Sequence, residues 1–183
     1  MGKFPVPMPP PGEMLRRRQA EMVRQRKRTE GLCFLFLTAA FFVLIFSRVL
    51  MIHRNQGLGM FPTAADGDLV LVRRMSGEWN RDDLIVYRWE GELYLGRIAA
   101  LERDEVMMND SGSLLVNGSV RDGQVLYPTY ARGNEVFPQQ VPEGAVYILG
   151  DHRTQSRDSR DFGSIPQNGI VGKVIAILRI GDL

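Results

Sequence analysis

Residues 150–163 read Gly-Asp-His-Arg-Thr-Gln-Ser-Arg-Asp-Ser-Arg-Asp-Phe-Gly, the most distinctive stretch of this 183-residue chain. The segments on either side, Val146 to Leu149 and Ile170 to Ile180, are rich in apolar and β-branched residues. Such runs are typical of β-strands. The sequence therefore predicts a polar loop held between two strands.

Two shorter motifs lie upstream of this loop. One runs from Gly57 to Thr63 as Gly-Leu-Gly-Met-Phe-Pro-Thr and is followed by Gly67-Asp68; the other is Tyr94-Leu95-Gly96-Arg97-Ile98. With the third motif they resemble the serine box, the lysine box and the G-D-N-R-x-x-S-x-D-S-R-x-F-G signature of type I signal peptidases. These are membrane-bound serine proteases that remove signal peptides. Taken alone, the first motif is also typical of a flexible linker, but about ten of fourteen positions match in the third, which favours the family.

The resemblance places glycine at both reacting positions. Gly59 stands where the family has its nucleophilic serine, and Gly96 stands at the lysine that acts as general base. Chemistry of this kind needs a hydroxyl and a neutral amine, and glycine supplies neither. Lys173 is the one lysine beyond residue 27, and it resembles the lysine of the family's terminal G-K-V, which is not the base.

Other residues of the motifs receive supporting roles from the same resemblance. Ser156 corresponds to a serine that hydrogen-bonds the lysine, and Asp158 and Arg160 correspond to an ion-pair network that braces the site. Asp151 and Arg153 belong to the same supporting set.

An apolar segment lies inside the first motif. Met60, Phe61 and Pro62 line a former substrate groove, rest on the bilayer or pack in the ordinary way. Trp79 and Trp89 are either interfacial anchors or packing residues.

No cofactor or metal is predicted. The two histidines, His53 and His152, are far apart in sequence and lack a cluster of further ligands. His152 replaces an asparagine of the family signature and has a side chain that can titrate near neutrality. The only cysteine, Cys33, falls within an apolar run, so the remaining chain has neither a disulfide nor a thiol nucleophile.

The apolar run predicts a membrane anchor over residues 31–52. As a helix these 22 residues span roughly 33 Å, enough for a hydrocarbon core of about 30 Å. A cleaved secretory signal is the competing interpretation, but the run is long for one and no small-x-small cleavage site follows it.

The residues before the span predict its orientation. Residues 1–30 form a tail that is rich in proline at its start and carries eight basic against three acidic residues, a net charge of +5. Cationic flanks stay in the cytoplasm, so we expect residues 53–183 outside the cell membrane. Nucleic-acid binding is not expected, because the cluster lacks interleaved aromatic residues and adjoins the span.

Residues 53–183 predict a mainly β fold. Short apolar runs recur between turn residues, and Asn117-Gly118 is a two-residue hairpin signal. We expect continuous runs such as Leu69 to Val72 to be apolar on both faces, and Asp122 to Gly144 to be a poorly ordered excursion. The resemblance implies an antiparallel, coiled β-sheet domain of the signal peptidase type.

Two functions follow from these observations. The first is a catalytically inactive homologue, a membrane accessory or chaperone factor for secreted or surface proteins such as pilus subunits, which binds signal-peptide-like segments. The second is an active signal peptidase that uses an unrecognised nucleophile and base. A deliberately disabled variant is a further alternative, although such variants usually carry alanine.

Overall fold

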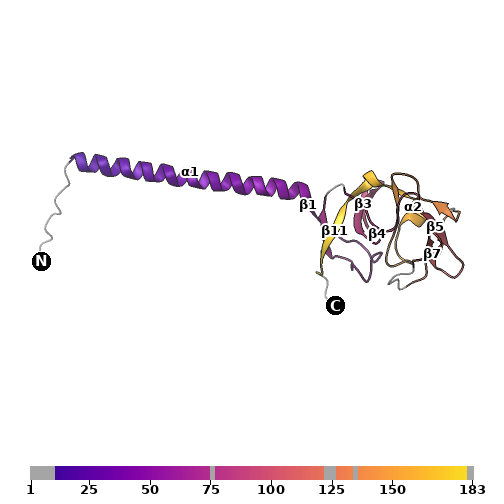
Figure 1. Cartoon of the computed structure of the whole chain (residues 1–183). Helices are drawn as coiled ribbons and strands as arrows, with labels where there is room; N and C mark the ends of the chain where they lie inside the picture. Colours follow the sequence, from indigo (N-terminus) through magenta and orange to yellow (C-terminus); the bar gives the residue numbers. More distant parts are fainter. Residues whose placement is uncertain (1–10, 75–76, 122–126, 134–135, 181–183) are drawn as a thin grey trace, which may run out of the picture. The chain divides into compact units, whose positions relative to one another are not determined.

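The computed structural model describes residues 11–74, 77–121, 127–133 and 136–180 (Figure 1). The chain divides into two compact units, residues 1–47 and residues 48–183. The described part of the first unit is formed by the helix α1 (Pro11–Val49), and the second unit begins with the last residues of this helix and the strand β1 (Leu50–Arg54). The proline-rich start of the tail, at residues 1–10, lies outside the described residues.

Helix α1 contains one segment, Glu21–Val49, that is long and apolar enough to cross a membrane. The helix ends at Val49, three residues before the predicted end of the span. Leu50 to Ile52 instead pair with β2, antiparallel and in register with Leu71 to Arg73. Apolar residues suit a bilayer helix and a strand equally well, so hydropathy alone misplaced this boundary.

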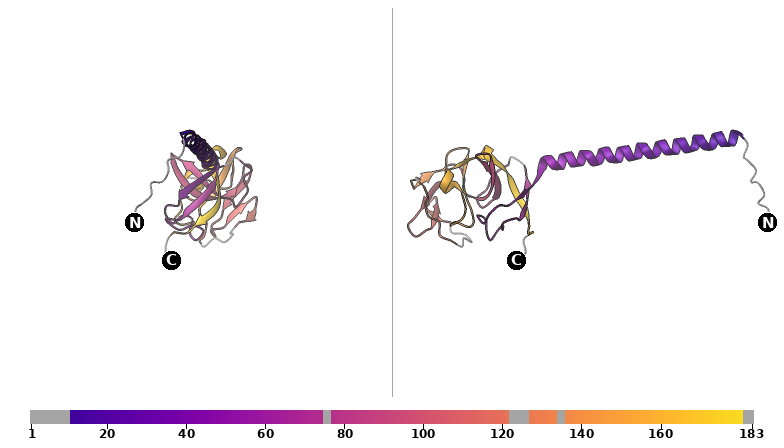
Figure 2. Two further views of the ribbon diagram at one scale, coloured as in Figure 1. Left: turned by 90° about the vertical axis from the view of Figure 1, so that its left-hand side faces the viewer. Right: turned by 180° about the vertical axis from the view of Figure 1, so that it is seen from behind.

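The second unit is mainly β, with antiparallel pairing throughout its described strands, as the sequence predicted. One sheet has seven strands in the order β1-β2-β11-β3-β4-β9-β10, and a second has four in the order β7-β6-β5-β8. The C-terminal strand β11, yellow in Figure 2, thus lies in the same sheet as the first two strands. The remaining elements are β2 (Leu69–Arg73), β3 (Leu84–Trp89), β4 (Glu92–Ala100), β5 (Glu105–Met108), β6 (Leu114–Val116), β7 (Ser119–Val120), β8 (Gln139–Gln140), β9 (Ala145–Leu149), α2 (Ser159–Phe162), β10 (Ile165–Pro166), η1 (Gln167–Gly169) and β11 (Ile170–Leu178).

The predicted hairpin turn is confirmed. Asn117 and Gly118 have φ of 52° and 74° and connect β6 to β7, with Val116 opposite Ser119. Both central residues of such a turn need positive φ, which asparagine and glycine tolerate best.

The prediction of strands that are apolar and buried on both faces holds for β9 and fails for β2. All five residues of β9 are buried, because it lies between β4 and β10 and contributes to two core clusters. In β2, Val70 and Val72 are fully buried while Leu69 and Leu71 are partly exposed. On the outer face of β2, Leu69 and Leu71 are therefore only partly covered within the described chain, and Arg73 is exposed.

The predicted excursion between Asp122 and Gly144 is corrected for residues 127–133 and 136–144, while its remaining residues lie outside the described part of the chain. Gln139 and Gln140 form β8, which pairs with β5, and residues 127–133 pack on the loop at 150–163. The prolines and glycines of this stretch indicated irregular backbone, but irregular backbone can still be held by side-chain contacts.

Candidate functional site

The loop at 150–163 leaves strand β9 and ends in the single turn of α2. Asp158 is the N-cap of this turn: its carboxylate accepts from the backbone N–H of Arg160 at 3.2 Å. The side chain of Asp161 accepts in return from the N–H of Asp158 at 3.1 Å. This reciprocal capping box satisfies donors that a helix start leaves without partners.

A buried ion pair forms the centre of the loop. The Asp158 and Arg160 side chains are each 1% exposed, and Arg160 donates from Nε and Nη2 to the two carboxylate oxygens at 2.9 and 2.8 Å. Ser156 Oγ donates to Asp158 at 2.6 Å and accepts from Arg160 at 3.0 Å. The hydroxyl that the resemblance assigns to the lysine base is therefore bound to the ion pair.

These contacts set the protonation state of Asp158. Burial by itself would raise the pKa of the carboxyl, but the hydrogen bond and positive charge of Arg160 outweigh it and lower the pKa below its usual range. Hydrogen bonds from Ser156 and from the Gly150 N–H add to the lowering. Asp158 is thus held as the carboxylate.

A second carboxylate joins the three sequence motifs. Asp151 of the loop accepts from Arg97 Nε and Nη2 at 2.9 and 2.7 Å, a bidentate pair. Thr63 Oγ1 donates to the same carboxylate at 2.5 Å. One residue from each motif therefore meets at Asp151, although 34 to 88 positions separate them in sequence.

Gly59 lies against the loop. Its carbonyl accepts from the His152 N–H at 3.0 Å. A Cβ at this position would lie 3.2 Å from Ser156 Cα and 3.4 Å from Ser156 Cβ, which is tight but close to ordinary contact. Gly150 permits this approach, because a Cβ there would lie 2.6 Å from the Gly59 carbonyl oxygen.

Gly96 lies in a fully packed environment. A Cβ at this position of β4 would be 2.4 Å from Ile148 Cγ2 and 3.0 Å from Tyr87 Cε1. Ile148 and Tyr87 are both 0% exposed. Neighbouring core side chains thus occupy the space into which a longer side chain at position 96 would extend.

The hydroxyl of Tyr87 is buried and has no hydrogen-bond partner among the described residues. Burial, followed by the charge of Asp158, raises the pKa of this hydroxyl above its ordinary value. An unpaired buried hydroxyl costs free energy relative to an apolar group of the same shape.

Tyr87→Phe is accordingly expected to leave the free energy of unfolding unchanged or to increase it by about 1 kcal/mol. Chemical denaturation of the two proteins in the same detergent measures the difference. A loss of more than about 1 kcal/mol would show that the hydroxyl has a stabilising partner after all.

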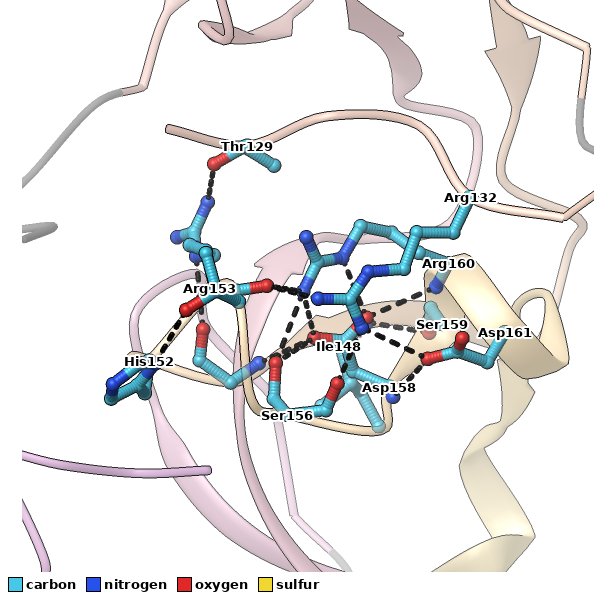
Figure 3. Close-up of polar contacts among 12 residues, drawn as sticks. Thr129, Arg132, Ile148, His152, Arg153, Ser156, Asp158, Ser159, Arg160 and Asp161 are labelled. Atoms are coloured by element: carbon cyan, nitrogen blue, oxygen red, sulfur yellow. Dashed lines mark hydrogen bonds and ion pairs between the residues drawn. The ribbon is translucent and has the colours of Figure 1, made fainter. Parts of the chain in front are cut away.

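Three residues of the segment 127–133 that the sequence analysis did not single out hold the loop, and Figure 3 shows two of them, Thr129 and Arg132. Arg132 donates to the carbonyl of Ser156 at 2.6 Å and also to the carbonyl of Arg153. Thr129 accepts from Arg153, and Tyr127 stacks on His152 with ring centroids 4.3 Å apart. No spacing rule predicts contacts over 21 to 24 positions between two irregular segments.

His152 pairs with a hydroxyl group. Its Nδ1 lies 3.1 Å from Thr154 Oγ1, and the imidazole is 7% exposed beneath Tyr127. The backbone of His152 is bonded to Gly59, so this hydroxyl and imidazole lie in the loop that faces the expected nucleophile position.

The three residues that were expected to line a groove differ in their solvent exposure. Met60 is buried, 2% exposed, whereas Phe61 is 43% exposed and Pro62 is also exposed. Trp79 and Trp89 both pack on the core cluster that contains Tyr87, and Trp89 stacks on Phe162 at 5.2 Å.

Comparisons with known proteins agree with the motifs. A family model described as signal peptidase, peptidase S26, matches residues 28–179. Signal peptidase I of Bacillus caldolyticus is 33% identical over 135 residues, 65% of this chain and 74% of that protein. The inactive signal peptidase IA of Staphylococcus aureus strain Mu50 is 27% identical over 154 residues, 75% of this chain and 85% of that protein.

A crystal structure and two longer relatives also match. The structure of a signal peptidase I from Enterococcus faecalis V583 is 27% identical and has a TM-score of 0.44, covering 56% of this chain and 100% of the other. The chain spans only 34% and 38% of two thylakoidal processing peptidases from Arabidopsis thaliana, the first of them a probable one. Since the family model covers most of its length, the chain belongs to the signal peptidase family, peptidase S26.

Proposed function

We propose that the chain is a catalytically inactive member of this family that binds exported polypeptides at the membrane surface without cleaving them. One observation carries the proposal: Gly59 and Gly96 stand where the family motifs have the nucleophile and the base, and Ile148 and Tyr87 fill the space beside Gly96. Removing both members of such a pair eliminates several orders of magnitude of rate. The similarity to a protein named inactive signal peptidase IA supports the same conclusion.

The binding partners that we propose are signal-peptide-like segments of secreted or surface proteins, including pilus subunits. Strand β4 pairs with β3 from Glu92 to Arg97, but its pairing with β9 covers only Arg97 to Ala100. Within the described residues, the β4 edge from Glu92 to Gly96 therefore has no strand on its second side. An extended peptide can add to such an edge through main-chain hydrogen bonds.

Cleavage of a preprotein by the purified full-length chain tests the proposal. We expect no product above the level of a matched preparation from cells lacking the chain, while a crosslinkable signal peptide is still captured. Cleavage at the ordinary small-x-small site that exceeds that background would refute the inactive assignment.

A second candidate function, an active peptidase, has one observation in its favour. Thr154 Oγ1 and His152 Nδ1 form a hydroxyl-imidazole pair at 3.1 Å. If this pair supplied nucleophile and base, cleavage would be observed and would be abolished in Thr154→Val. Absence of cleavage in both proteins would exclude the pair as a catalytic site.

We further propose that α1 anchors the chain in the membrane with its N-terminus in the cytoplasm. This is the arrangement predicted from the sequence, with a cytoplasmic tail at residues 1–30, a membrane span at 31–52 and an outer domain at 53–183. The outer face of β1, β2 and β11 then faces lipid. Ile52, Leu71 and Ala176 occupy one row across these strands, and Ile52 is 64% exposed. This apolar row, which Arg54 and Arg73 flank on the same face, follows the helix closely in sequence, and a bilayer would provide apolar surroundings that water does not.

If the outer sheet faces lipid, a polarity-sensitive dye should report different surroundings at two exposed positions, Ile52 and Val120. In a Cys33→Ser background, a polarity-sensitive dye at Ile52→Cys is expected to shift its emission to the blue in lipid nanodiscs. A dye at Val120→Cys on β7, which is 59% exposed, is expected to report water. Equal emission from the two positions would contradict a lipid-facing outer sheet.

A further inference from the structure

The part of helix α1 that precedes the apolar run is cationic and exposed. The helix continues without a break from Pro11 through Gly31, where the apolar run begins (Figure 1). All side chains at residues 21–30 are exposed, and this stretch carries four basic residues against two acidic ones, a net charge of +2. Exposed cations directly beside a membrane span are typical of segments that bind anionic lipids.

Three of these cations share one face of the helix. Arg24, Lys27 and Arg28 are three and four positions apart, and residues with this spacing are neighbours on the surface of an α-helix. The described residues that line the groove on this face include four cations and no carboxylate: Arg16, Gln19, Val23, Arg24, Lys27 and Arg28. This face of the helix therefore attracts anions.

The two carboxylates of the stretch do not cancel the charge of this face. Glu30 is paired with Arg26, which donates from Nε to Oε1 at 2.9 Å. Glu21 lies one turn before Arg24 and is the carboxylate nearest to it in sequence. Among the described side chains, none of the three cations forms an ion pair. Three positive charges against the single negative charge of Glu21 leave the face with a net charge of +2.

The length of the helix between these cations and the apolar run places them at the phospholipid headgroups. At about 1.5 Å per residue, Arg28 and Lys27 lie roughly 4.5 and 6 Å before Gly31, and Arg24 lies roughly 10.5 Å before it. The headgroup layer on each side of a bilayer is about 5–7 Å thick, and the long side chains of arginine and lysine can bend toward it. Arg16 lies roughly 22 Å before Gly31, well beyond the headgroup layer.

We propose that Arg24, Lys27 and Arg28 bind the phosphate groups of anionic phospholipids in the leaflet that surrounds this end of the span. Guanidinium and ammonium groups bind phosphates through charge-assisted hydrogen bonds. Lipid is the partner that fits, because the three cations lie at the depth of the headgroups. The site rests on the proposed membrane span of α1, but neither on the direction of that span nor on whether the chain cleaves peptides.

Electron paramagnetic resonance of spin-labelled lipids, in phosphatidylcholine vesicles that contain the full-length chain, tests the proposal. At low salt, spin-labelled phosphatidylglycerol is expected to associate with the chain about fivefold more strongly than spin-labelled phosphatidylcholine. The preference is expected to fall in about 1 M salt, where charges are screened over about 3 Å. Equal association of the two lipids, or a preference that does not depend on salt, would overturn the proposal.

Matched variants locate the site along the helix. The near variant replaces the three proposed binding residues together: Arg24→Gln, Lys27→Gln and Arg28→Gln. The distant variant removes the same number of charges farther from the apolar run: Arg16→Gln, Arg17→Gln and Arg18→Gln. The near variant is expected to reduce the lipid preference to less than about twofold, and the distant variant to leave it unchanged. An unchanged preference in the near variant, or an equal loss in both variants, would overturn the proposal.

Two controls identify the cause of a negative result. Release of the chain from the vesicles by alkaline carbonate would refute the membrane span, and the lipid site with it. A chain that resists carbonate but does not prefer phosphatidylglycerol would refute the lipid site alone. A fluorescent RNA that binds the chain in the vesicles and abolishes the lipid preference would show that this face binds nucleic acid, which would also overturn the proposal.

Discussion

Restoring the two expected catalytic residues, with Gly59→Ser and Gly96→Lys together, is expected to yield no peptidase activity and a less stable protein. The reason lies at position 96, where even a Cβ would be 2.4 Å from Ile148 Cγ2 and 3.0 Å from Tyr87. Overpacking of this kind costs about 1–3 kcal/mol, and a desolvated ammonium adds several more. The lysine would have to displace core side chains before it could approach Ser156.

Alanine variants at the two positions separate the steric effect from the charge. Gly96→Ala is expected to lose about 1–3 kcal/mol in the free energy of unfolding. Gly59→Ala is expected to lose less than about 1 kcal/mol, because its Cβ meets Ser156 only at 3.2 Å and beyond. Recovery of activity in the double variant, or equal stability of the two alanine variants, would show that the space beside Gly96 is open.

Asp158→Ala is expected to lower the free energy of unfolding by about 3–5 kcal/mol, since it leaves Arg160 as an uncompensated buried charge. Arg160→Ala is expected to have a similar effect for the converse reason. The control is Arg103→Ala, which breaks an ion pair of the same 2.8 Å length between side chains that are 70% and 75% exposed. Thermal and denaturant unfolding in detergent measure all three.

The loss in Asp158→Ala has a defined pH dependence. Because folding lowers the pKa of Asp158, its stabilisation is complete above the unfolded pKa of about 3.9 and is lost as pH falls through the folded value. The difference between the two proteins should therefore narrow in acid. A difference that stays constant down to pH 2, or one no larger than that of Arg103→Ala, would contradict the bracing role.

Local signals predicted much of the fold. Val146 to Leu149 was expected as a strand and lies within β9, because runs of apolar residues of this length are typical of buried strands. Asn117-Gly118 specified its turn through backbone preferences alone. Leu50 to Ile52 were misplaced, since their pairing with β2 depends on residues 19 to 23 positions away.

The candidate site was predictable in part. The motifs named Asp151, Ser156, Asp158 and Arg160, but nothing local indicated that Arg97 would join Asp151 or that Arg132 would bond the loop carbonyls. The motifs also did not indicate that the space beside Gly96 is filled, because this depends on the packing of Ile148 and Tyr87 from adjacent strands. Long-range packing decides these features, and sequence spacing does not encode it.

We infer that no hydroxyl of the chain acts as a peptidase nucleophile. Intact-mass spectrometry after treatment with an acylating inhibitor of serine-lysine peptidases tests it most directly, with an active signal peptidase I treated in parallel. We expect an unchanged mass for this chain and a single acyl adduct on the active enzyme. One stoichiometric adduct on this chain, on Thr154 or any other hydroxyl, would contradict it.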